Sequence, residues 1–421
     1  MARPADVARR AQGSARAPSA VGGTAAGLCA LLVGIGLARF AYTPLIPALI
    51  AAGWFSPAHA AYLGAANLAG YLVGALAARR LAARMPAAHV LRGMMLVATA
   101  AFFACATPLS FLWFFLWRFL AGLAGGSLMV LAPPTVLPHV PAARRGLAGG
   151  LIFTGVGLGI AASGTLVPLL LRGGLVATWC GLGVLALALT ALSWRGWPAG
   201  APVASAAPSR VDPAGGRGGM VGLALAALFV EYGLNATGLV PHMVFLVDFV
   251  ARDLGRGLAT GAGYWVVFGV GALLGPAASG AAGDRIGFGP ALRLSLLVQA
   301  AAVAVLAFTA APAVLAISSF VIGAFVPGCS TLVLGRVREL LPDDPAAQTA
   351  AWSRATMAFA LGLAVSAYGF SFVFERAGGY ALLFALGGAV LLVAFILDLA
   401  VGLRSPTPPR PGAAPAARTA G

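Results

Sequence analysis

Long apolar runs follow one another along almost the whole chain. A helix of about 20 apolar residues crosses the hydrocarbon core of a bilayer. Inside that core the backbone must satisfy its own hydrogen bonds, as a helix does. The runs therefore predict an all-α membrane protein with twelve transmembrane helices. The predicted spans are 22–50, 58–78, 90–109, 111–134, 146–171, 175–194, 220–247, 258–282, 289–310, 313–335, 350–373 and 379–403.

The composition argues against several other classes of protein. Only 9% of the 421 residues are charged, whereas a soluble domain carries about 25%. The net charge of +16 comes from arginines dispersed in short clusters, without a basic face of the kind that binds nucleic acid. The four cysteines form no Cys-x-x-Cys pair and the histidines show no metal-ligand spacing, so we expect no metal and no cofactor. All basic residues are arginines and alanine and glycine abound, which suggests a GC-rich bacterial genome and hence the bacterial inner membrane.

The arginines lie mostly on one side of the predicted membrane. Both termini and alternate connections hold 20 of the 27, and the side rich in arginine is normally cytoplasmic. Asp248 and Arg252 fall in a connection on the opposite side. We therefore expect both termini in the cytoplasm. The expected organisation is a cytoplasmic tail 1–21, a six-helix bundle 22–194, a cytoplasmic linker 195–219, a second six-helix bundle 220–403 and a disordered cytoplasmic tail 404–421.

Short motifs recur at corresponding places in the two halves. The second span contains Gly70-x-x-x-Gly74-x-x-x-Ala78-Arg79, and the eighth ends with Gly280-x-x-x-Asp284-Arg285-x-Gly287. The fourth and tenth spans contain Phe119-Leu-Ala-Gly122 and Phe320-Val-Ile-Gly323. Together with the number of spans, these matches predict a duplicated bundle.

These motifs resemble those of the major facilitator superfamily. GAAGDRIG at 280–287 is similar to its G-x-x-x-D-R-x-G loop motif, and the segment that begins at Arg118 is similar to its R-x-x-x-G-x-G motif. GIGLARFAYTPLIP in the first span and GLVPHMVFLVDF in the seventh resemble the YbfB/YjiJ-type branch, whose members are mostly transporters without an assigned substrate. The resemblance implies two six-helix bundles around a central cavity that opens alternately to either side.

Two departures from the superfamily pattern affect what the resemblance implies. Ala78 stands where the first-half motif has an acidic residue, so the gating loop is expected at Asp284 and Arg285. The fifth span lacks the Gly-Pro pair of the antiporter motif, which weakens the interpretation as an exporter.

Three polar side chains share one face of the seventh span. Glu231, Asn235 and His242 are spaced, with Gly238, at i, i+4, i+7 and i+11, which aligns them along one stripe of a helix. Such a stripe indicates either a water-accessible cavity or a hydrogen-bonded seam that only holds helices together. We expect Glu231 to be the proton carrier, because burial favours a neutral carboxyl and a nearby arginine favours a charged one.

Arg39 lies deep in the first span, where a cation is costly. It shares a face with Thr43, has Tyr42 at the edge of that face, and is followed by Pro44. A guanidinium next to a loosened backbone is suited to binding a carboxylate through two parallel hydrogen bonds. The alternative is that Arg39 pairs with Glu231 for structural reasons alone.

The leading hypothesis is a proton-coupled secondary transporter of a small organic solute such as an organic anion. Arg39, Tyr42, Thr43, Asn235 and His242 would bind the substrate. Glu231 and Arg118 would couple transport to protons, although for Arg118 a structural ion pair is an equal alternative. The expected partners are lipid, the substrate and protons, and the expected state is a monomer.

The alternative function within transport is an efflux carrier for amphipathic compounds, which the aromatic-rich spans allow. A non-transporting sensor is a third interpretation. An enzyme is not expected, because the sequence shows no paired carboxylates, nucleophile elbow or clustered metal ligands. It also contains no P-loop, so nothing supports a nucleotide-driven step.

Overall fold

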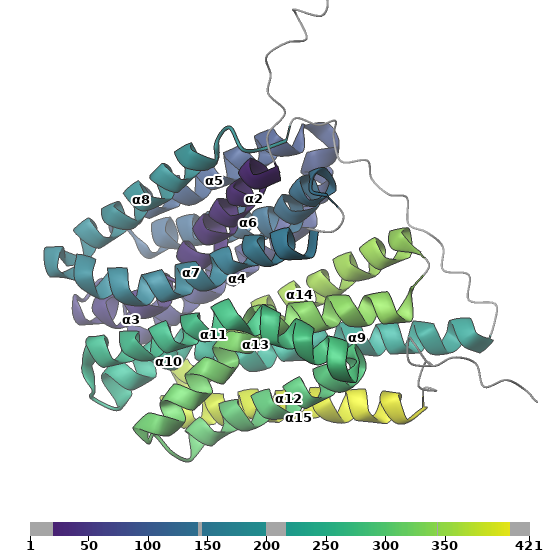
Figure 1. Ribbon diagram of the computed structural model, residues 1–421. Helices are drawn as coiled ribbons and strands as arrows, with labels where there is room; N and C mark the ends of the chain where they lie inside the picture. Colours follow the sequence, from purple (N-terminus) through teal and green to yellow (C-terminus); the bar gives the residue numbers. More distant parts are fainter. Residues whose placement is uncertain (1–19, 142–144, 199–215, 343, 405–421) are drawn as a thin grey trace, which may run out of the picture.

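The computed structural model describes residues 20–141, 145–198, 216–342 and 344–404, and all regular structure in these ranges is helical (Figure 1). The predicted tails and most of the predicted linker lie outside these ranges. The helices are α2 (Ala20–Leu31), η1 (Leu32–Leu37), α3 (Tyr42–Ala51), α4 (Pro57–Arg84), α5 (Ala87–Ala104), α6 (Phe111–Val136), η2 (Leu137–His139), α7 (Arg145–Leu170), η4 (Leu171–Gly173), α8 (Gly174–Ser193), α9 (Gly216–Val240), η5 (Pro241–Phe245), α10 (Leu246–Asp248), η6 (Phe249–Asp253), α11 (Gly257–Ile286), α12 (Phe288–Ala304), η7 (Val305–Ala307), α13 (Pro312–Leu340), α14 (Pro345–Ala377) and α15 (Tyr380–Arg404).

Eleven segments of the described chain are long and apolar enough to cross a membrane. One of them, Ala148–Ser193, has 46 residues and contains both α7 and α8. The short helix η4 separates them, and Gly174 after it has a φ of 89°, a backbone conformation that glycine adopts without strain. A Cβ on Gly181 would contact Leu170, so the chain folds back at this turn, where the sequence predicts a boundary.

Local signals in the sequence fix several helix ends. The side chains of Ser56, Ser110 and Asp344 accept hydrogen bonds from backbone N–H groups three residues later, at 3.2, 3.1 and 2.8 Å. These are N-terminal caps of α4, α6 and α14. At the other end, α14 stops at Gly378, which has a φ of 65°, a left-handed conformation that commonly ends a helix.

The helices pack as two groups that repeat the same arrangement. In the first group, α2 to α8, the packed pairs include α4 with α6, α5 with α6, α5 with α8, and α2 with α7. In the second group, α9 to α15, the corresponding pairs are α11 with α13, α12 with α13, α12 with α15, and α9 with α14. Figure 1 shows the first group, in purple and blue, beside the second, in green and yellow. The recurrence of the same pairs supports the predicted duplication.

Glycines at close helix crossings give the register of the repeat. A Cβ on Gly70 would overlap Phe119 O in the first group, and a Cβ on Gly271 would overlap Phe320 O in the second. The two glycines lie 201 positions apart in the sequence, and so do the two phenylalanines. The alignment of Ala78 with Asp284 made from the sequence is therefore wrong.

By the same offset, Ala83 and Arg84 of the first half correspond to Asp284 and Arg285 of the second half. Helix ends agree with this register, since α4 ends at Arg84 and α11 ends at Ile286. The abundance of small residues around Ala78 allowed the wrong alignment. The conclusion that the first-half loop lacks the motif's acidic residue still holds, because Ala83 is also an alanine.

The seventh span is longer than its apolar run suggests. Beyond α9 the chain continues through η5, α10 and η6 to Asp253, and Asp248 is only 2% exposed. The sequence analysis placed Asp248 in a connection, which is wrong. The Tyr380 hydroxyl donates a hydrogen bond to Asp248 Oδ2, and Arg252 Nε lies 3.5 Å from Asp248 Oδ1. These partners allow a carboxyl group to be buried inside the helix.

The two groups meet mainly through α7 with α11 and α4 with α14. We call the end of the molecule where α8 ends and α9 begins the linker end, and the end marked by α3 and α10 in Figure 1 the far end. The Tyr62 hydroxyl donates to Glu375 Oε2 at 2.8 Å, and both residues lie near the far ends of their helices. Trp265 Nε1–H donates to Ser163 Oγ at 3.1 Å. These bonds join the groups in the half of the molecule next to the far end.

Candidate functional site

The first helix is interrupted at Arg39. The π-helical segment η1 ends at Leu37, a turn follows, and α3 begins at Tyr42. Pro44 has no N–H to donate to the carbonyl of Phe40, and that carbonyl instead accepts from Thr43 N at 3.3 Å. A π-helical segment followed by a turn exposes backbone groups in the middle of the membrane, as often occurs at functional sites.

The Arg39 guanidinium lies between aromatic rings. Its Cζ is 4.9 Å from the ring centre of Phe40 and 5.4 Å from that of Tyr71, distances at which a cation is attracted to the face of a ring. Arg39 Nη2 also donates to Met243 Sδ at 3.7 Å, and Met243 belongs to the second group. Neither Arg39 nor Glu231 takes part in the three ion pairs found within the described ranges.

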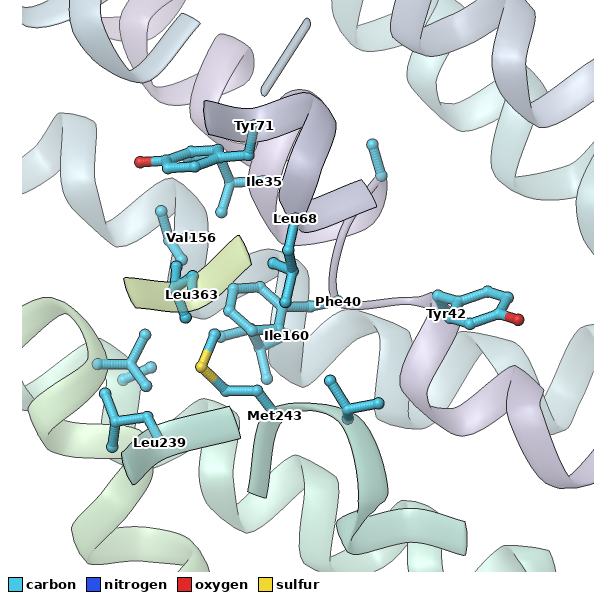
Figure 2. Packing of buried hydrophobic residues seen from close by; sticks show 14 of the residues in the cluster. Ile35, Phe40, Tyr42, Leu68, Tyr71, Val156, Ile160, Leu239, Met243 and Leu363 are labelled. Atoms are coloured by element: carbon cyan, nitrogen blue, oxygen red, sulfur yellow. The ribbon is translucent and has the colours of Figure 1, made fainter. Parts of the chain in front are cut away.

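Arg39 borders a cavity between the two groups. The volume of this cavity is about 40 Å³, hardly more than the roughly 30 Å³ that one water molecule occupies in the liquid. Figure 2 shows how closely the surrounding side chains pack, with Met243 beside Phe40 and Ile160, and Tyr71 beside Ile35 and Val156. The lining residues are Ile35, Arg39, Phe40, Tyr71, Met129, Phe153, Val156, Tyr232, Met243, Val326, Pro327, Ser330, Trp352, Thr356 and Phe359.

Tyr42 and Thr43 turn their hydroxyl groups to the protein itself. Thr43 Oγ1 donates to Met243 O at 2.6 Å, and the Tyr42 hydroxyl donates to Ala60 O at 2.9 Å. Figure 2 shows Tyr42 pointing away from Tyr71 and Met243. The structure thus brings Thr43 to the contact between the groups, and it places the Tyr42 side chain outside the cavity lining.

Arg118 supports the interruption in the first helix. Its Nη1 donates to Ala38 O at 2.7 Å, and its Cζ lies 4.2 Å from the ring centre of Tyr42. The side chain is 3% exposed, and Nε finds no hydrogen-bond partner within the described ranges. Arg118 therefore holds the turn after η1 with a charged hydrogen bond, which is stronger than a neutral one.

The stripe on the seventh helix faces the interior of the second group. Asn235 Nδ2 donates to Gln299 Oε1 of α12 at 2.8 Å. A Cβ on Gly238 would overlap Leu391 of α15. Glu231 is 3% exposed, and the charged groups whose field acts on it are Asp398, Arg336 and Arg293. The predicted common face exists, but in this conformation it lies against α12, α13 and α15, and none of its polar members lines the central cavity.

His242 belongs to the same interior. Its Nε2 lies 2.8 Å from Ser318 Oγ, and the Ser318 hydroxyl donates to Ala302 O at 2.6 Å. Because the hydroxyl proton is used in that bond, His242 Nε2 must be the donor to Ser318. His242 Nδ1 has no hydrogen-bond partner within the described ranges. The geometry is that of a neutral histidine in a helix seam.

The expected gating residues Asp284 and Arg285 are exposed at the linker end of α11. The turn after them is held by Glu339 of α13, whose Oε1 accepts from Phe288 N at 2.8 Å. Arg336 Nη1 lies 3.0 Å from the other carboxylate oxygen of Glu339. The sequence analysis missed this support, because residues of α13 that meet the turn cannot be identified from the loop motif alone.

The sequence analysis also missed the aromatic residues of the cavity. Tyr232 directly follows Glu231 in the sequence, and its hydroxyl lies 2.7 Å from Ser330 Oγ. Neighbouring residues on a helix point about 100° apart. Because Glu231 points into the second group, Tyr232 points toward the cavity. The sequence alone does not give this direction, because it does not give the rotation of the helix.

The comparisons with known proteins agree with this fold. Residues 31–399 match a family described as "Uncharacterised MFS-type transporter YbfB". One of the solved structures that the chain resembles is titled "Crystal structure of D-xylose-proton symporter", with a TM-score of 0.71 and 17% identity. The match covers 89% of this chain and 96% of that one, and at this identity it shows the fold alone. None of the curated proteins matches the chain.

Proposed function

Because the chain belongs to the YbfB-type family of MFS transporters, and thus to the secondary transporters, we propose that it carries a small organic anion in symport with protons by alternating access. The observation that carries the choice of an anion is Arg39. Among the described residues that line the cavity between the two groups, it is the only charged one. A cation without an acidic neighbour in a cavity at membrane depth attracts a negatively charged ligand.

We also propose the topology that fits this activity. Twelve spans, two domains at 22–194 and 220–403, and both termini in the cytoplasm of a bacterium would place the linker end on the cytoplasmic side. The bonds between the groups in the far half then correspond to a conformation closed to the outside. Transport requires a second conformation in which those bonds open and the linker end closes.

In the proposed mechanism, Arg39 contacts the substrate and the other predicted binding residues support it. Thr43 fixes the first helix to Met243, and Tyr42 supports Arg118. Asn235 and His242 hold the seventh helix in its seam. Asp284 and Arg285 lie at the loop that the conformational change must move.

Glu231 is the proposed proton carrier. It is a buried carboxyl group, and no hydrogen bond to its carboxyl oxygens is found within the described ranges. Two arginines and one carboxylate act on it from α12, α13 and α15. A change in the packing of those helices would change the balance of charge around Glu231, and with it the affinity of Glu231 for a proton.

Proteoliposomes with an imposed proton gradient test this proposal. We expect at least one member of a panel of organic anions to accumulate above the level of protein-free vesicles, and D-xylose not to accumulate. Glu231→Gln should abolish the dependence on the gradient while exchange of labelled for unlabelled substrate persists. Glu375→Gln is the matched control, because it removes a carboxylate at the far end but keeps an oxygen that accepts a hydrogen bond from the Tyr62 hydroxyl. Unchanged gradient dependence in Glu231→Gln would exclude Glu231 as the carrier.

A second candidate function is efflux of amphipathic compounds. The observation in its favour is a groove of about 710 Å³ on the surface of the second group, between α9, α14 and α15, with an almost wholly apolar lining that includes Leu234, Leu361 and Phe370. Such a groove is accessible from the lipid. Expression-dependent resistance to amphipathic cations, together with no uptake of any organic anion, would favour this function over the first.

A further inference from the structure

The residues that line the central cavity restrict the class of anion more narrowly than a negative charge alone does. In the described part of the chain, one arginine and no acidic residue line it, so one anionic group is balanced and a second would be buried without a partner, at a high cost in free energy. The cavity is therefore suited to a monoanion.

The donors around Arg39 have the geometry for a carboxylate. The acceptor found for the guanidinium within the described ranges is Met243 Sδ, and a thioether sulfur is a weak acceptor. The planar guanidinium can donate two parallel bonds to one carboxylate. The Tyr71 hydroxyl, for which no hydrogen bond is found in the described ranges, belongs to the same lining. It provides a further donor beside Arg39.

Aromatic rings form much of the remaining wall. Tyr232 lies with its ring centre 4.6 Å from that of Phe359 and 6.4 Å from that of Trp352. Phe40, Tyr71 and Phe153 complete the aromatic part of the lining. Rings at these distances stack in offset or tilted pairs with another ring, so a planar aromatic body has partners on several sides.

The other hydroxyl groups of the lining are already paired. The Tyr232 and Ser330 hydroxyls are bonded to each other, and Thr356 Oγ1 donates to Trp352 O at 2.9 Å. A sugar would bury several hydroxyl groups among these rings, and each one left without a partner weakens binding. The lining thus disfavours a polyol, even though the fold is shared with a sugar symporter.

From these observations we infer that the substrate is an aromatic monocarboxylate, with its carboxylate on Arg39 and Tyr71 and its ring among Tyr232, Trp352 and Phe359. This inference rests on the proposed function and names the class of anion carried. The volume of about 40 Å³ is too small for such a molecule, so binding requires the lining to move. Met129 and Met243 lie in the lining, and methionine side chains adapt easily to a new neighbour.

Calorimetric titration of the purified protein with a ligand series tests the inference without any variant. Benzoate is the probe. Acetate, benzamide and phthalate each change one property of it, and D-xylose is a neutral polyol that has neither the carboxylate nor the aromatic ring. We expect benzoate to bind at least about tenfold more tightly than each of the others, since one charged hydrogen bond or one stacked ring contributes about 1.4 kcal/mol or more. Equal affinity for acetate would overturn the aromatic part of the inference, and equal affinity for benzamide would overturn the carboxylate part.

Variants then locate the site. Arg39→Ala should weaken benzoate binding by about tenfold or more, and Tyr71→Phe by about threefold to tenfold. Arg354→Ala is the control, because Arg354 lies two residues after Trp352 but is exposed. Should Arg39→Ala not fold, Tyr71→Phe and Phe359→Leu give the same test with milder changes. Benzoate affinities unchanged in these variants would place the binding site elsewhere.

The binding test and the uptake test fail in different ways. If another anion accumulates in proteoliposomes but benzoate does not bind, the proposed function stands and the inference is wrong. If benzoate binds at Arg39 but no anion accumulates, the ligand class stands and the transport proposal is wrong.

Discussion

A buried and a half-buried arginine in the first group, Arg118 and Arg39, have different surroundings. Arg118 Nη1 donates to the carbonyl of Ala38, and the guanidinium covers the ring of Tyr42, so Arg118 holds the turn. Arg39 stacks between rings and borders the cavity. The contrast supports the proposal that Arg39 meets the ligand, whereas Arg118 maintains the interruption of the helix.

A single hydroxyl ties the interrupted first helix to the seventh. Thr43→Val removes the donor to Met243 O while keeping the shape of the side chain. A hydrogen bond of this kind contributes about 1 kcal/mol. We therefore expect backbone amides of residues 241–253 to exchange with solvent about fivefold faster, as measured by hydrogen–deuterium exchange with mass spectrometry.

Thr135→Val is the control for this change. Thr135 is also buried, but its hydroxyl donates to Leu131 O of its own helix. Exchange in residues 241–253 should stay as in the unaltered protein. Equal acceleration in both variants would mean that the hydroxyl of Thr43 has no special role in joining the groups.

Residue spacing predicted a shared face but not the direction of that face. The positions of Glu231, Asn235 and His242 fix their angles about the helix axis. They carry no information on how the helix is rotated against its neighbours. That rotation is set by contacts with α12 and α15, such as Gln299 with Asn235, which come from distant parts of the sequence. The stripe was therefore predictable, and the cavity residue Tyr232 was not.

At the scale of the helices, the first and seventh spans share a departure from regular α-helix. Each contains a π-helical segment, η1 at Leu32–Leu37 and η5 at Pro241–Phe245. Thr43, in α3 beyond the turn that follows η1, donates to Met243 O of η5 and so joins the two interrupted helices across the groups. Because a π-helical turn holds its backbone less regularly than an α-helix, these segments are the elements most suited to change shape during transport.

A glycine at the crossing of α7 and α11 lets the two groups meet. A Cβ on Gly269 would overlap the backbone of Ala161. Gly269→Val should therefore destabilise the observed conformation by about 1–3 kcal/mol, the usual cost of overpacking. We expect the distance between spin labels on His59→Cys and Ala377→Cys, two exposed positions at the far end, to lengthen in electron resonance measurements.

Gly263→Val is the matched control on the same helix. No atom lies within 4 Å of a Cβ at that position, so the label distance should not change. If both valine variants gave the distance of the unaltered protein, the crossing at Gly269 would not hold the far end closed.

Apolar runs predicted the helices well because membrane helices need them. The predicted ends of the helices were wrong where a polar group is buried with a partner. Asp248 marks the end of an apolar run in the sequence, yet it lies inside the helix because Tyr380, 132 positions later, donates to it. A partner so distant in sequence cannot be identified from the run itself.

The fold as a whole could be predicted from the chain, because hydropathy, charge bias and repeated glycines all point to one duplicated bundle. The central cavity could not. Its walls come from eight helical elements and the turn at Arg39, and its position depends on how the two groups pack against each other. That arrangement follows from contacts such as Gly269 with Ala161, where small residues on both helices permit a close approach.

The orientation of the molecule in the membrane is the last prediction. The arginine bias predicts that the linker end lies in the cytoplasm. Four exposed positions form one pair at each end of the molecule: Ala83 and Asp284, which the offset of 201 relates, at the linker end, and Leu109 and Ala311 at the far end. Changing each to cysteine leaves every arginine in place. A membrane-impermeant maleimide added to intact spheroplasts should label Leu109→Cys and Ala311→Cys, and should label Ala83→Cys and Asp284→Cys only in inside-out vesicles.

Each pair has one position in either half of the chain, so the two halves are tested separately. The native cysteines give little background, because Cys29, Cys105 and Cys329 are buried and the half-buried Cys180 can be changed to serine. Labelling of Ala83→Cys and Leu109→Cys from the same side would mean that α5 does not cross the membrane. Opposite results for Ala83→Cys and Asp284→Cys would mean that the halves are inverted relative to each other, which would contradict an arrangement with both termini in the cytoplasm. Labelling of both linker-end positions from outside would reverse the whole molecule, and the conformation described here would then be the one closed to the cytoplasm.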